Sequence, residues 1–145
     1  MTAIVHELPA SGLRIATDAF AGRRIHFIGG GGIGISALME LARARGAQVT
    51  GCDGACGGQV DHLREMDLEV AVGHDPAHLD GCDELVFSAA IPETHPEIRR
   101  AKALSIQATP RMAFLGRLER GVRPVSVTGS HGKTSTTWMI AQLLI

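Results

Sequence analysis

Short runs of apolar residues alternate along the chain with longer segments in which apolar residues recur every three or four positions. The short runs predict β-strands, and the periodic segments predict helices. The expected strands span residues 24–28, 48–52, 68–72, 84–88, 105–108 and 125–128. The expected helices span about residues 33–45, 60–66, 96–104, 112–118 and 134–145. Alternation of this kind is typical of an α/β fold with a Rossmann-like, doubly wound parallel sheet.

The length of 145 residues is enough for one domain with a substantial core and is short for two. Composition changes near Gly121-Val122-Arg123-Pro124, which marks a boundary. We therefore expect an N-terminal extension over residues 1–21 and a nucleotide-binding domain over residues 22–120. Residues 121–145 would then supply the first strand, glycine loop and helix of a second, incomplete domain.

Charge is nearly balanced, with 14 basic and 15 acidic residues, so no nucleic-acid or anionic-membrane partner is expected. Aromatic residues are too scarce for a base-stacking surface. No run approaches the roughly 20 apolar residues of a membrane span, and the N-terminus does not resemble a signal peptide. The three cysteines show no disulfide framework. Together these features predict a cytoplasmic protein.

The first glycine-rich run, from Gly29 to Gly34, lies between an expected strand and an expected helix. Gly29, Gly31 and Gly34 fit the G-x-G-x-x-G pattern, in which glycine permits a tight turn and close approach of a pyrophosphate. The helix would direct free N–H groups at the phosphates. Asp53 lies nineteen residues after Gly34, where an acid commonly binds a ribose hydroxyl. The pattern fits NAD, FAD and UDP-sugars alike, and a turn required only for packing is the structural alternative.

The second glycine-rich run, from Gly129 to Thr134, also lies between an expected strand and a helix, and its chemistry is that of a P-loop. Backbone N–H groups would hold phosphates, Lys133 would place a charge on the β- and γ-phosphates, and the Thr134 hydroxyl is suited to ligate Mg²⁺. Val127 stands where the general pattern has another glycine, so this loop is shorter by two residues. His131 either fills a loop position or takes part directly.

Three further features carry weaker signals. Cys52 and Cys56, with Cys82 and scattered histidines, have a spacing within the broad range of zinc sites, but no second Cys or His pair completes four ligands. Free thiols in loops are the favoured interpretation. Ser88 ends a strand at the edge where open α/β sheets bind ligands. His74, in the loop after the third strand, is either a ligand contact or a solvated side chain.

The two glycine-rich loops resemble loops of one known protein family. Residues 129–137 resemble the ATP loop of the Mur ligases, and residues 26–36 are similar to the N-terminal loop of those members that add L-alanine to UDP-N-acetylmuramate. Further similar residues lie between the loops: Gly51-Cys52-Asp53, Gly73-His74, Ser88-Ala89-Ala90-Ile91, Pro96-Glu97, Arg111, Leu115 and Leu118. The departures, at Gly30, Ile35, His95 and Ser130, remove no charge and no phosphate-facing glycine. The resemblance covers about residues 22–145.

This resemblance implies an ATP- and Mg²⁺-dependent ligase of peptidoglycan precursor synthesis. The lactyl carboxylate of UDP-N-acetylmuramate would take the γ-phosphoryl group, and the amine of L-alanine would attack the acyl phosphate. The implied contacts to the UDP substrate are Gly29, Gly31, Gly32, Ile33, Gly34, Asp53, His74 and Ser88. The implied contacts to ATP are Gly129, Ser130, His131, Gly132, Lys133, Thr134 and Ser135. Lys133 and Thr134 would be catalytic, and Thr134 would ligate Mg²⁺.

Several alternatives stay open at this point. The related ligase that attaches a ready-made tripeptide has similar motifs. An NAD-binding oxidoreductase domain and a non-catalytic UDP-sugar-binding module fit the first loop, but the oxidoreductase leaves the second unexplained. Members of the family are several hundred residues long, so we expect this chain to be a fragment that binds the UDP substrate without ligase activity. Its apolar C-terminal helix is expected to be exposed and to favour self-association.

Overall fold

We describe the protein from a computed structural model, in which residues 20–120 and 124–144 are described. The chain divides into one unit over Ala16–Arg120 and a second that includes Gly121–Ile145, and we treat each by itself. The expected extension over residues 1–21 lies almost entirely outside the described residues. Within the described ranges, no helix is both long and apolar enough to cross a membrane.

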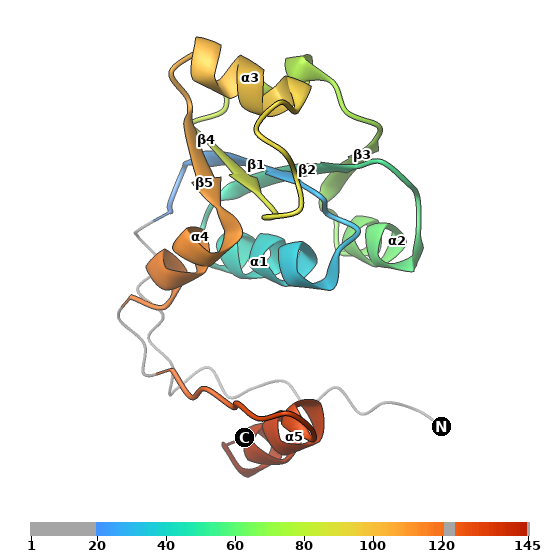
Figure 1. Cartoon of the computed structure of the whole chain (residues 1–145), viewed down its shortest axis with the longest axis vertical. Helices are drawn as coiled ribbons and strands as arrows, with labels where there is room; N and C mark the ends of the chain where they lie inside the picture. The colour runs from blue at the N-terminus through green and yellow to red at the C-terminus, as the bar shows by residue number, and fades with distance from the viewer. Residues whose placement is uncertain (1–19, 121–123, 145) are drawn as a thin grey trace. The chain divides into compact units, whose positions relative to one another are not determined.

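The larger unit contains a parallel sheet of five strands, which confirms the doubly wound α/β fold predicted from the sequence (Figure 1). Its strands are β1 (Arg24–Ile28), β2 (Gln48–Asp53), β3 (Glu69–Val72), β4 (Glu84–Phe87) and β5 (Gln107–Pro110). Their order across the sheet is β3-β2-β1-β4-β5, and every neighbouring pair is parallel. The order reverses between β1 and β4, so the carboxyl ends of these two strands form the topological switch point at which such sheets bind ligands.

Helices cover both faces of this sheet (Figure 1). Their bounds are α1 (Ile33–Ala44), α2 (Gly58–Glu65), the 3-10 turn η2 (Pro76–Leu79), α3 (Pro96–Ala103) and α4 (Arg111–Leu118). Figure 1 shows α1, α2 and α4 on one face and α3 on the other. The second unit contains α5 (Lys133–Leu144).

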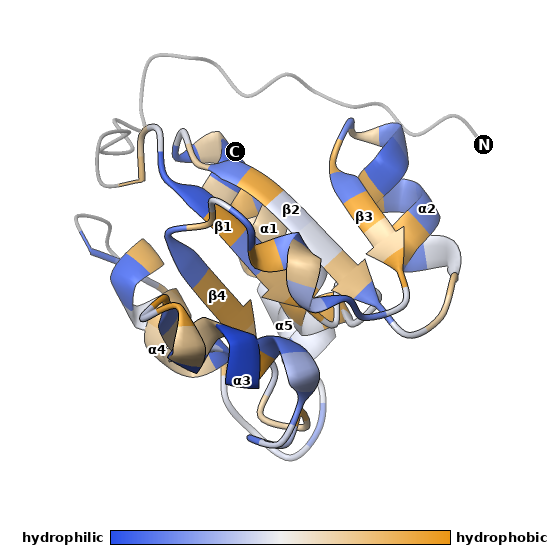
Figure 2. Ribbon diagram, turned by 90° about the horizontal axis from the view of Figure 1, so that it is seen from above, coloured by the Kyte–Doolittle hydropathy of each residue, from blue (hydrophilic) through white to orange (hydrophobic). Residues whose placement is uncertain are grey.

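The strands of the sheet contain many hydrophobic residues, drawn orange in Figure 2, and successive residues of β1 pack on opposite faces of the sheet. In β1, Ile25 and Phe27 join one buried cluster with residues of α1, α2 and α4. Ile28 joins a second cluster with residues of β4, η2 and α3. His26 is buried on this second side as well, 1% exposed, in a strand where the sequence pattern indicated only an apolar run. A polar group at such a depth requires a partner. Nδ1 of His26 is hydrogen-bonded to the Thr50 hydroxyl at 2.8 Å.

The amino end of the sheet is closed by a buried carboxylate. Glu84 at the start of β4 is fully buried, and it accepts hydrogen bonds from Thr109 in β5 at 2.6 Å and from both terminal nitrogens of Arg117 in α4 at 2.5 and 3.0 Å. Arg23 adds an ion pair at 3.4 Å. The bidentate contact compensates the desolvation of the carboxylate and fixes α4 against β4 and β5.

Two details differ from the sequence prediction. The fifth strand, expected over 105–108, spans Gln107–Pro110, because Ser105 adopts a left-handed φ of 56° and ends α3. Its neighbour Ile106 donates to the carbonyl of Ala101 at 2.9 Å, so these residues form a helix-ending Schellman motif. The strand expected over 125–128 is not formed, since no described segment pairs with it and a strand requires partners for its backbone groups.

Candidate functional site

The first glycine loop lies at the switch point, directly after β1. The N–H groups of Gly29 and Gly30 both donate to the carbonyl of Cys52 on β2, at 2.8 and 3.0 Å, and Gly32 donates to Gly29 at 3.0 Å. Gly29 has a φ of 90°, which non-glycine residues rarely adopt. The loop is thus a tight turn tied to the neighbouring strand, and it leads into α1 at Ile33.

Asp53, the last residue of β2, closes this loop from the side. Its Oδ2 accepts the N–H of Gly31 at 2.8 Å, and its Oδ1 accepts the N–H of Ala55 at 3.1 Å. A β-carbon on Gly31 would stand only 2.8 Å from the same carboxylate oxygen, so any other residue here would displace Asp53 from this contact. The sequence suggested that Gly31 faces a diphosphate and Asp53 a ribose. In the structure these two groups bind each other.

After Gly32, the next two amides are those of Ile33 and Gly34, which begin α1. Among the described residues, neither N–H has a hydrogen-bond partner, and Ile33 is 81% exposed. They open α1, whose first turn carries no acidic residue. Free amides and the positive end of the helix dipole together attract an anion such as a phosphate.

Arg111 adds a full positive charge at the same position. It begins α4, and its guanidinium occupies the space that a β-carbon on Gly34 would need. Sequence reasoning noted Arg111 only as a similar residue and did not include it among the binding residues, because it is 77 positions from Gly34 in the sequence. The fold brings this cation to the free amides, and a guanidinium is well suited to phosphate oxygens.

Ser88 and His74 flank the glycine loop at two other strand ends. Ser88 follows β4, the second strand of the switch point, and its hydroxyl accepts the N–H of Ala90 at 3.4 Å. His74 lies after β3, where its ring packs edge-on against His95 at 4.6 Å between centroids. Its Nδ1 lies 3.3 Å from the sulfur of Cys52, and its side chain is 29% exposed. Both residues therefore lie at the carboxyl edge of the sheet, as their positions in the sequence suggested.

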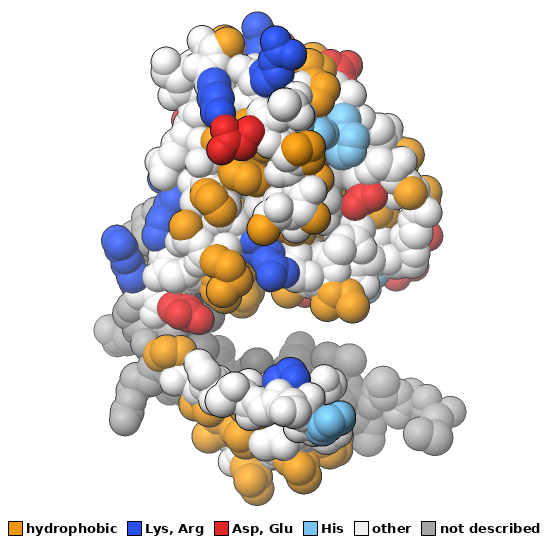
Figure 3. All heavy atoms as spheres, in the orientation of Figure 1, with side chains coloured by type: hydrophobic (Ala, Val, Ile, Leu, Met, Phe, Trp, Pro, Cys, Tyr) orange, Lys and Arg blue, Asp and Glu red, His pale blue; other side chains and the backbone are white. Residues whose placement is uncertain are grey.

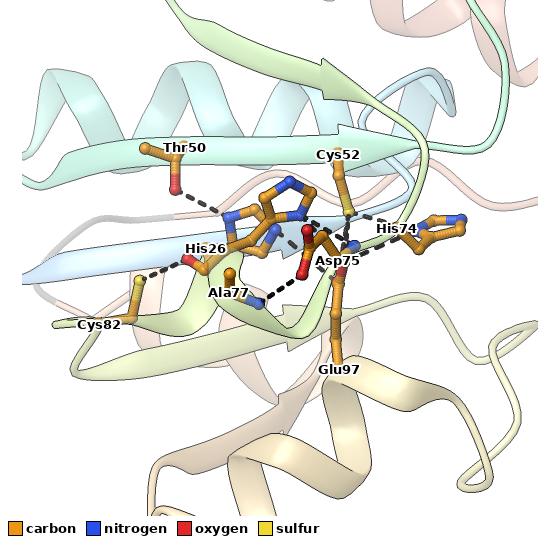
Figure 4. Close-up of polar contacts among 9 residues, drawn as sticks. His26, Thr50, Cys52, His74, Asp75, Ala77, Cys82 and Glu97 are labelled. Atoms are coloured by element: carbon orange, nitrogen blue, oxygen red, sulfur yellow. Dashed lines mark hydrogen bonds and ion pairs between the residues drawn. The ribbon is translucent and has the colours of Figure 1, made fainter.

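A buried carboxylate organises the loop that carries His74 (Figure 4). Glu97, in the first turn of α3, is fully buried, and its Oε1 accepts the N–H of Asp75 at 3.0 Å and contacts Nδ1 of His78 at 3.1 Å. The sulfur of Cys52 lies 3.3 Å from Oε2. Burial lowers the pKa of His26 to about 4, against the opposing attraction of Glu97. Burial, reinforced by Glu97, raises the pKa of the Cys52 thiol.

The cysteines correct one expectation. Cys52 is not a loop thiol, because it lies in β2 and is fully buried among aliphatic side chains and Glu97. Cys56 is exposed in the following loop, and Cys82 is half-buried before β4. The expectation of free thiols is confirmed. The sequence contains no second Cys or His pair at matching spacing, but the fold brings His26 and His78, from separate segments, to Cys52.

The second glycine loop wraps around its own lysine. Gly129 and Gly132 have φ values of 146° and 77°, and the Lys133 amine donates to the carbonyls of Gly129 at 2.6 Å and Ser130 at 3.3 Å. Ser130, His131, Thr134 and Ser135 are exposed around it. The N–H of Thr136 donates to Gly132 at 2.9 Å, so α5 opens directly from the loop. Left-handed glycines, a lysine folded over the loop and a helix N-terminus fit the requirements of a phosphate site.

Comparisons with known proteins identify the family of the chain, and the matching family model covers the unit that holds the first glycine loop. The family model described as "Mur ligase family, catalytic domain" matches residues 24–123. The UDP-N-acetylmuramate–L-alanine ligase of Symbiobacterium thermophilum is 42% identical over 123 residues, which cover 84% of this chain and 25% of that protein. The enzyme of the same name from Deinococcus radiodurans is 45% identical over 121 residues, or 80% of this chain and 25% of that protein. The chain thus spans about a quarter of the length of these relatives.

Solved structures give the same result. The crystal structure of the UDP-N-acetylmuramate-alanine ligase of Thermotoga maritima superposes with a TM-score of 0.78 at 31% identity, covering 83% of this chain and 29% of that one. A murein peptide ligase of Psychrobacter arcticus superposes with a TM-score of 0.76 at 31% identity, covering 85% of this chain and 26% of that one. From its family match, its sequence identity and its fold, this chain belongs to the Mur ligase family.

Proposed function

We propose that this chain is the N-terminal part of the ligase that joins L-alanine to UDP-N-acetylmuramate. The observation that carries the proposal is the meeting of the free amides of Ile33 and Gly34 with the Arg111 guanidinium at the switch point. We assign the diphosphate of the UDP substrate to this place. Gly29, Gly31, Gly32 and Asp53 shape the loop, while His74 and Ser88 flank it at the ends of β3 and β4.

We assign the phosphates of ATP to the second loop. Lys133 would exchange its bonds to the carbonyls of Gly129 and Ser130 for bonds to phosphate oxygens, and the Thr134 hydroxyl would ligate Mg²⁺. When bound, Mg²⁺ would neutralise charge on the phosphates. Residues 121–145 contain no Asp or Glu to complete its coordination. We therefore expect the 145-residue chain alone to be inactive as a ligase.

The reaction requires both sites. The lactyl carboxylate of the substrate attacks the γ-phosphorus of ATP, which forms an acyl phosphate and releases ADP. The amine of L-alanine then attacks the acyl carbon and expels inorganic phosphate as the amide forms. Lys133 would stabilise the charge that moves onto the transferred group. The larger unit would hold the substrate by its UDP end and take no part in bond making.

Binding measurements on the whole chain test this assignment. Calorimetric titration with UDP, UDP-N-acetylmuramate, NAD and ATP should show the strongest binding for the UDP ligands at the larger unit. Replacing Arg111 with Gln should weaken UDP binding by about tenfold or more, as loss of a charged hydrogen bond does. Arg99→Gln, on the exposed side of α3, is the matched control and should bind UDP normally.

The same titration separates the other assignments. Lys133→Ala should weaken ATP binding and leave UDP binding unchanged. A preference for NAD over UDP-N-acetylmuramate would overturn the proposal in favour of an oxidoreductase domain. A cytoplasmic location and self-association through α5 stay predictions. Trp138, Leu143 and Leu144 of α5 are exposed, and Figure 3 shows hydrophobic side chains on the surface of this unit.

A further inference from the structure

Four potential metal ligands meet on the face of the sheet that α3 covers (Figure 4). They come from β1, β2, η2 and α3, and are His26, Cys52, His78 and Glu97. One ligand atom from each lies within 4.8 Å of all the others. The side chains of His26 and Glu97 are 2% and 0% exposed, and that of His78 is 25% exposed. The group is therefore a compact set of two nitrogens, one sulfur and one carboxylate, reachable from one side.

His26 directs an unpaired nitrogen into this cluster. Its Nδ1 is hydrogen-bonded to the Thr50 hydroxyl at 2.8 Å. Its Nε2 is buried and has no hydrogen-bond partner among the described residues, with Oε2 of Glu97 3.8 Å away. A buried polar atom without a partner destabilises the folded protein. If Nδ1 carries the proton and donates to Thr50, the lone pair of Nε2 is free to bind a cation, with Thr50 as the outer partner that metal-binding histidines usually have.

Three distances between ligand atoms in this cluster are close to those of a tetrahedral zinc site. Bond lengths of about 2.0–2.3 Å to zinc place neighbouring ligand atoms about 3.3–3.8 Å apart. In this cluster the Cys52 sulfur lies 3.3 Å from Oε2 of Glu97 and Nδ1 of His78 lies 3.1 Å from Oε1. Nε2 of His26 lies 3.8 Å from Oε2. These distances involve both oxygens of Glu97, and one ligand atom from each of the four residues lies within 4.8 Å of the others, so side-chain rotations would draw the set together around an ion.

Charge and ligand type select the kind of ion. A thiolate at Cys52 and the carboxylate of Glu97 together balance a divalent cation, while the two histidines bind as neutral groups. Mg²⁺ and Ca²⁺ prefer oxygen ligands, whereas zinc accepts sulfur, nitrogen and oxygen together. We propose that His26, Cys52, His78 and Glu97 bind one zinc-type divalent ion that fixes the loop before η2 against β1 and α3.

The ion has a route to the site. A cleft of about 560 Å³ on this side of the sheet is lined by Thr50, His78 and Cys82, among others. Thr50 contacts His26, and His78 is itself a ligand, so the cleft borders the cluster. Binding replaces the S–H bond of Cys52 with a bond from sulfur to the metal, and the thiol proton leaves to solvent. No electron transfer is involved.

Cobalt substitution of the full chain tests this proposal. Chelator-treated protein should take up one Co²⁺ per chain and show the near-ultraviolet band of thiolate-to-cobalt charge transfer together with the strong visible bands of a tetrahedral ion. Zinc should displace the cobalt and remove both. In Cys52→Ser the charge-transfer band should vanish and zinc affinity should fall by about tenfold or more, the loss expected for one ligand. Cys56→Ser and Cys82→Ser should retain the wild-type spectrum and affinity.

His78→Asn keeps the test valid if Cys52→Ser unfolds, because His78 is partly exposed and its loss leaves the apolar core intact. It should lower zinc affinity by a similar factor while circular dichroism stays unchanged. Equal zinc affinity of His78→Asn and wild-type protein would overturn the proposal. So would a charge-transfer band that disappears in Cys56→Ser or Cys82→Ser, or the absence of any metal uptake by folded wild-type protein.

Discussion

Replacement of Gly34 by alanine should separate stability from ligand binding in this chain. Gly34 lies in the first turn of α1 with a helical backbone, so the conformational effect of alanine is favourable, by at most about 1 kcal/mol. The new β-carbon would collide with the end of the Arg111 side chain, which is flexible and partly exposed. Arg111 can swing away, so the free energy of unfolding should change little.

Binding of UDP should respond quite differently. Displacement of Arg111 removes a charged hydrogen bond to the phosphates, worth about 1.5–3 kcal/mol, or roughly a 10- to 100-fold loss of affinity. Chemical denaturation gives the first quantity and calorimetric titration with UDP gives the second. Gly116→Ala is the matched control: it lies in α4, nothing lies within 4 Å of its added β-carbon, and it should gain stability without loss of UDP binding.

A double-mutant cycle identifies the cause. If Gly34→Ala acts by moving Arg111, its effect on UDP binding should shrink to nearly nothing in an Arg111→Gln background. An undiminished effect would mean that the β-carbon blocks the phosphate directly. Two results would refute the reasoning. Wild-type UDP affinity in Gly34→Ala would show that Arg111 has no role in binding. Loss of the folded state would show that Arg111 cannot move away from the new β-carbon.

Three further predictions concern other parts of the structure. Ser105→Gly should raise the free energy of unfolding by about 1 kcal/mol, because glycine relieves the left-handed backbone at a φ of 56°, whereas Gly46→Ala at the end of α1 should lower it, both measured by urea denaturation. Arg117→Met leaves the buried Glu84 with a weaker set of partners and should destabilise by about 3–5 kcal/mol, and Arg120→Met, outside that network, should not. Asp53→Ala frees the N–H of Gly31 and should increase hydrogen exchange at that amide at least several-fold, while the same measurement at Ile28 in β1 stays unchanged.

The order of strands and helices was readable from the sequence because it depends on local patterns. Apolar runs indicated the five strands of the sheet, and the helix expected over about residues 33–45 corresponds to α1, which is followed by Gly46, a residue type that commonly ends a helix. Ser105 gave no such signal, since serine seldom adopts left-handed backbone, and so the fifth strand was placed two residues too early. Residues 125–128 have β-forming side chains, but strand formation depends on a partner elsewhere, which local propensity cannot report.

The site was only partly predictable for a related reason. Glycine spacing located the first glycine loop, to which we assign the diphosphate, because the pattern lies within six consecutive residues. Arg111 and Glu97 reach their sites from helices far along the chain, and their roles follow from the crossover connections of the sheet. The metal-site patterns that can be recognised in a sequence use close pairs of ligands. His26, Cys52, His78 and Glu97 come from four separate segments, so no such pattern could find them.

The end of β2 contributes residues to both proposed sites, but we expect substitutions at one site to leave ligand binding at the other unchanged. Successive side chains of a strand face opposite sides of the sheet, so Asp53 holds the glycine loop while the neighbouring Cys52 joins the histidine cluster. The backbone carbonyl of Cys52 also accepts the N–H groups of Gly29 and Gly30. Cys52→Ser alters the sulfur and preserves that carbonyl. It should therefore abolish the cobalt charge-transfer band and leave UDP affinity within about twofold, whereas Arg111→Gln should do the reverse. If both variants weakened both ligands equally, one structural collapse at the end of β2, rather than two separate sites, would account for the result.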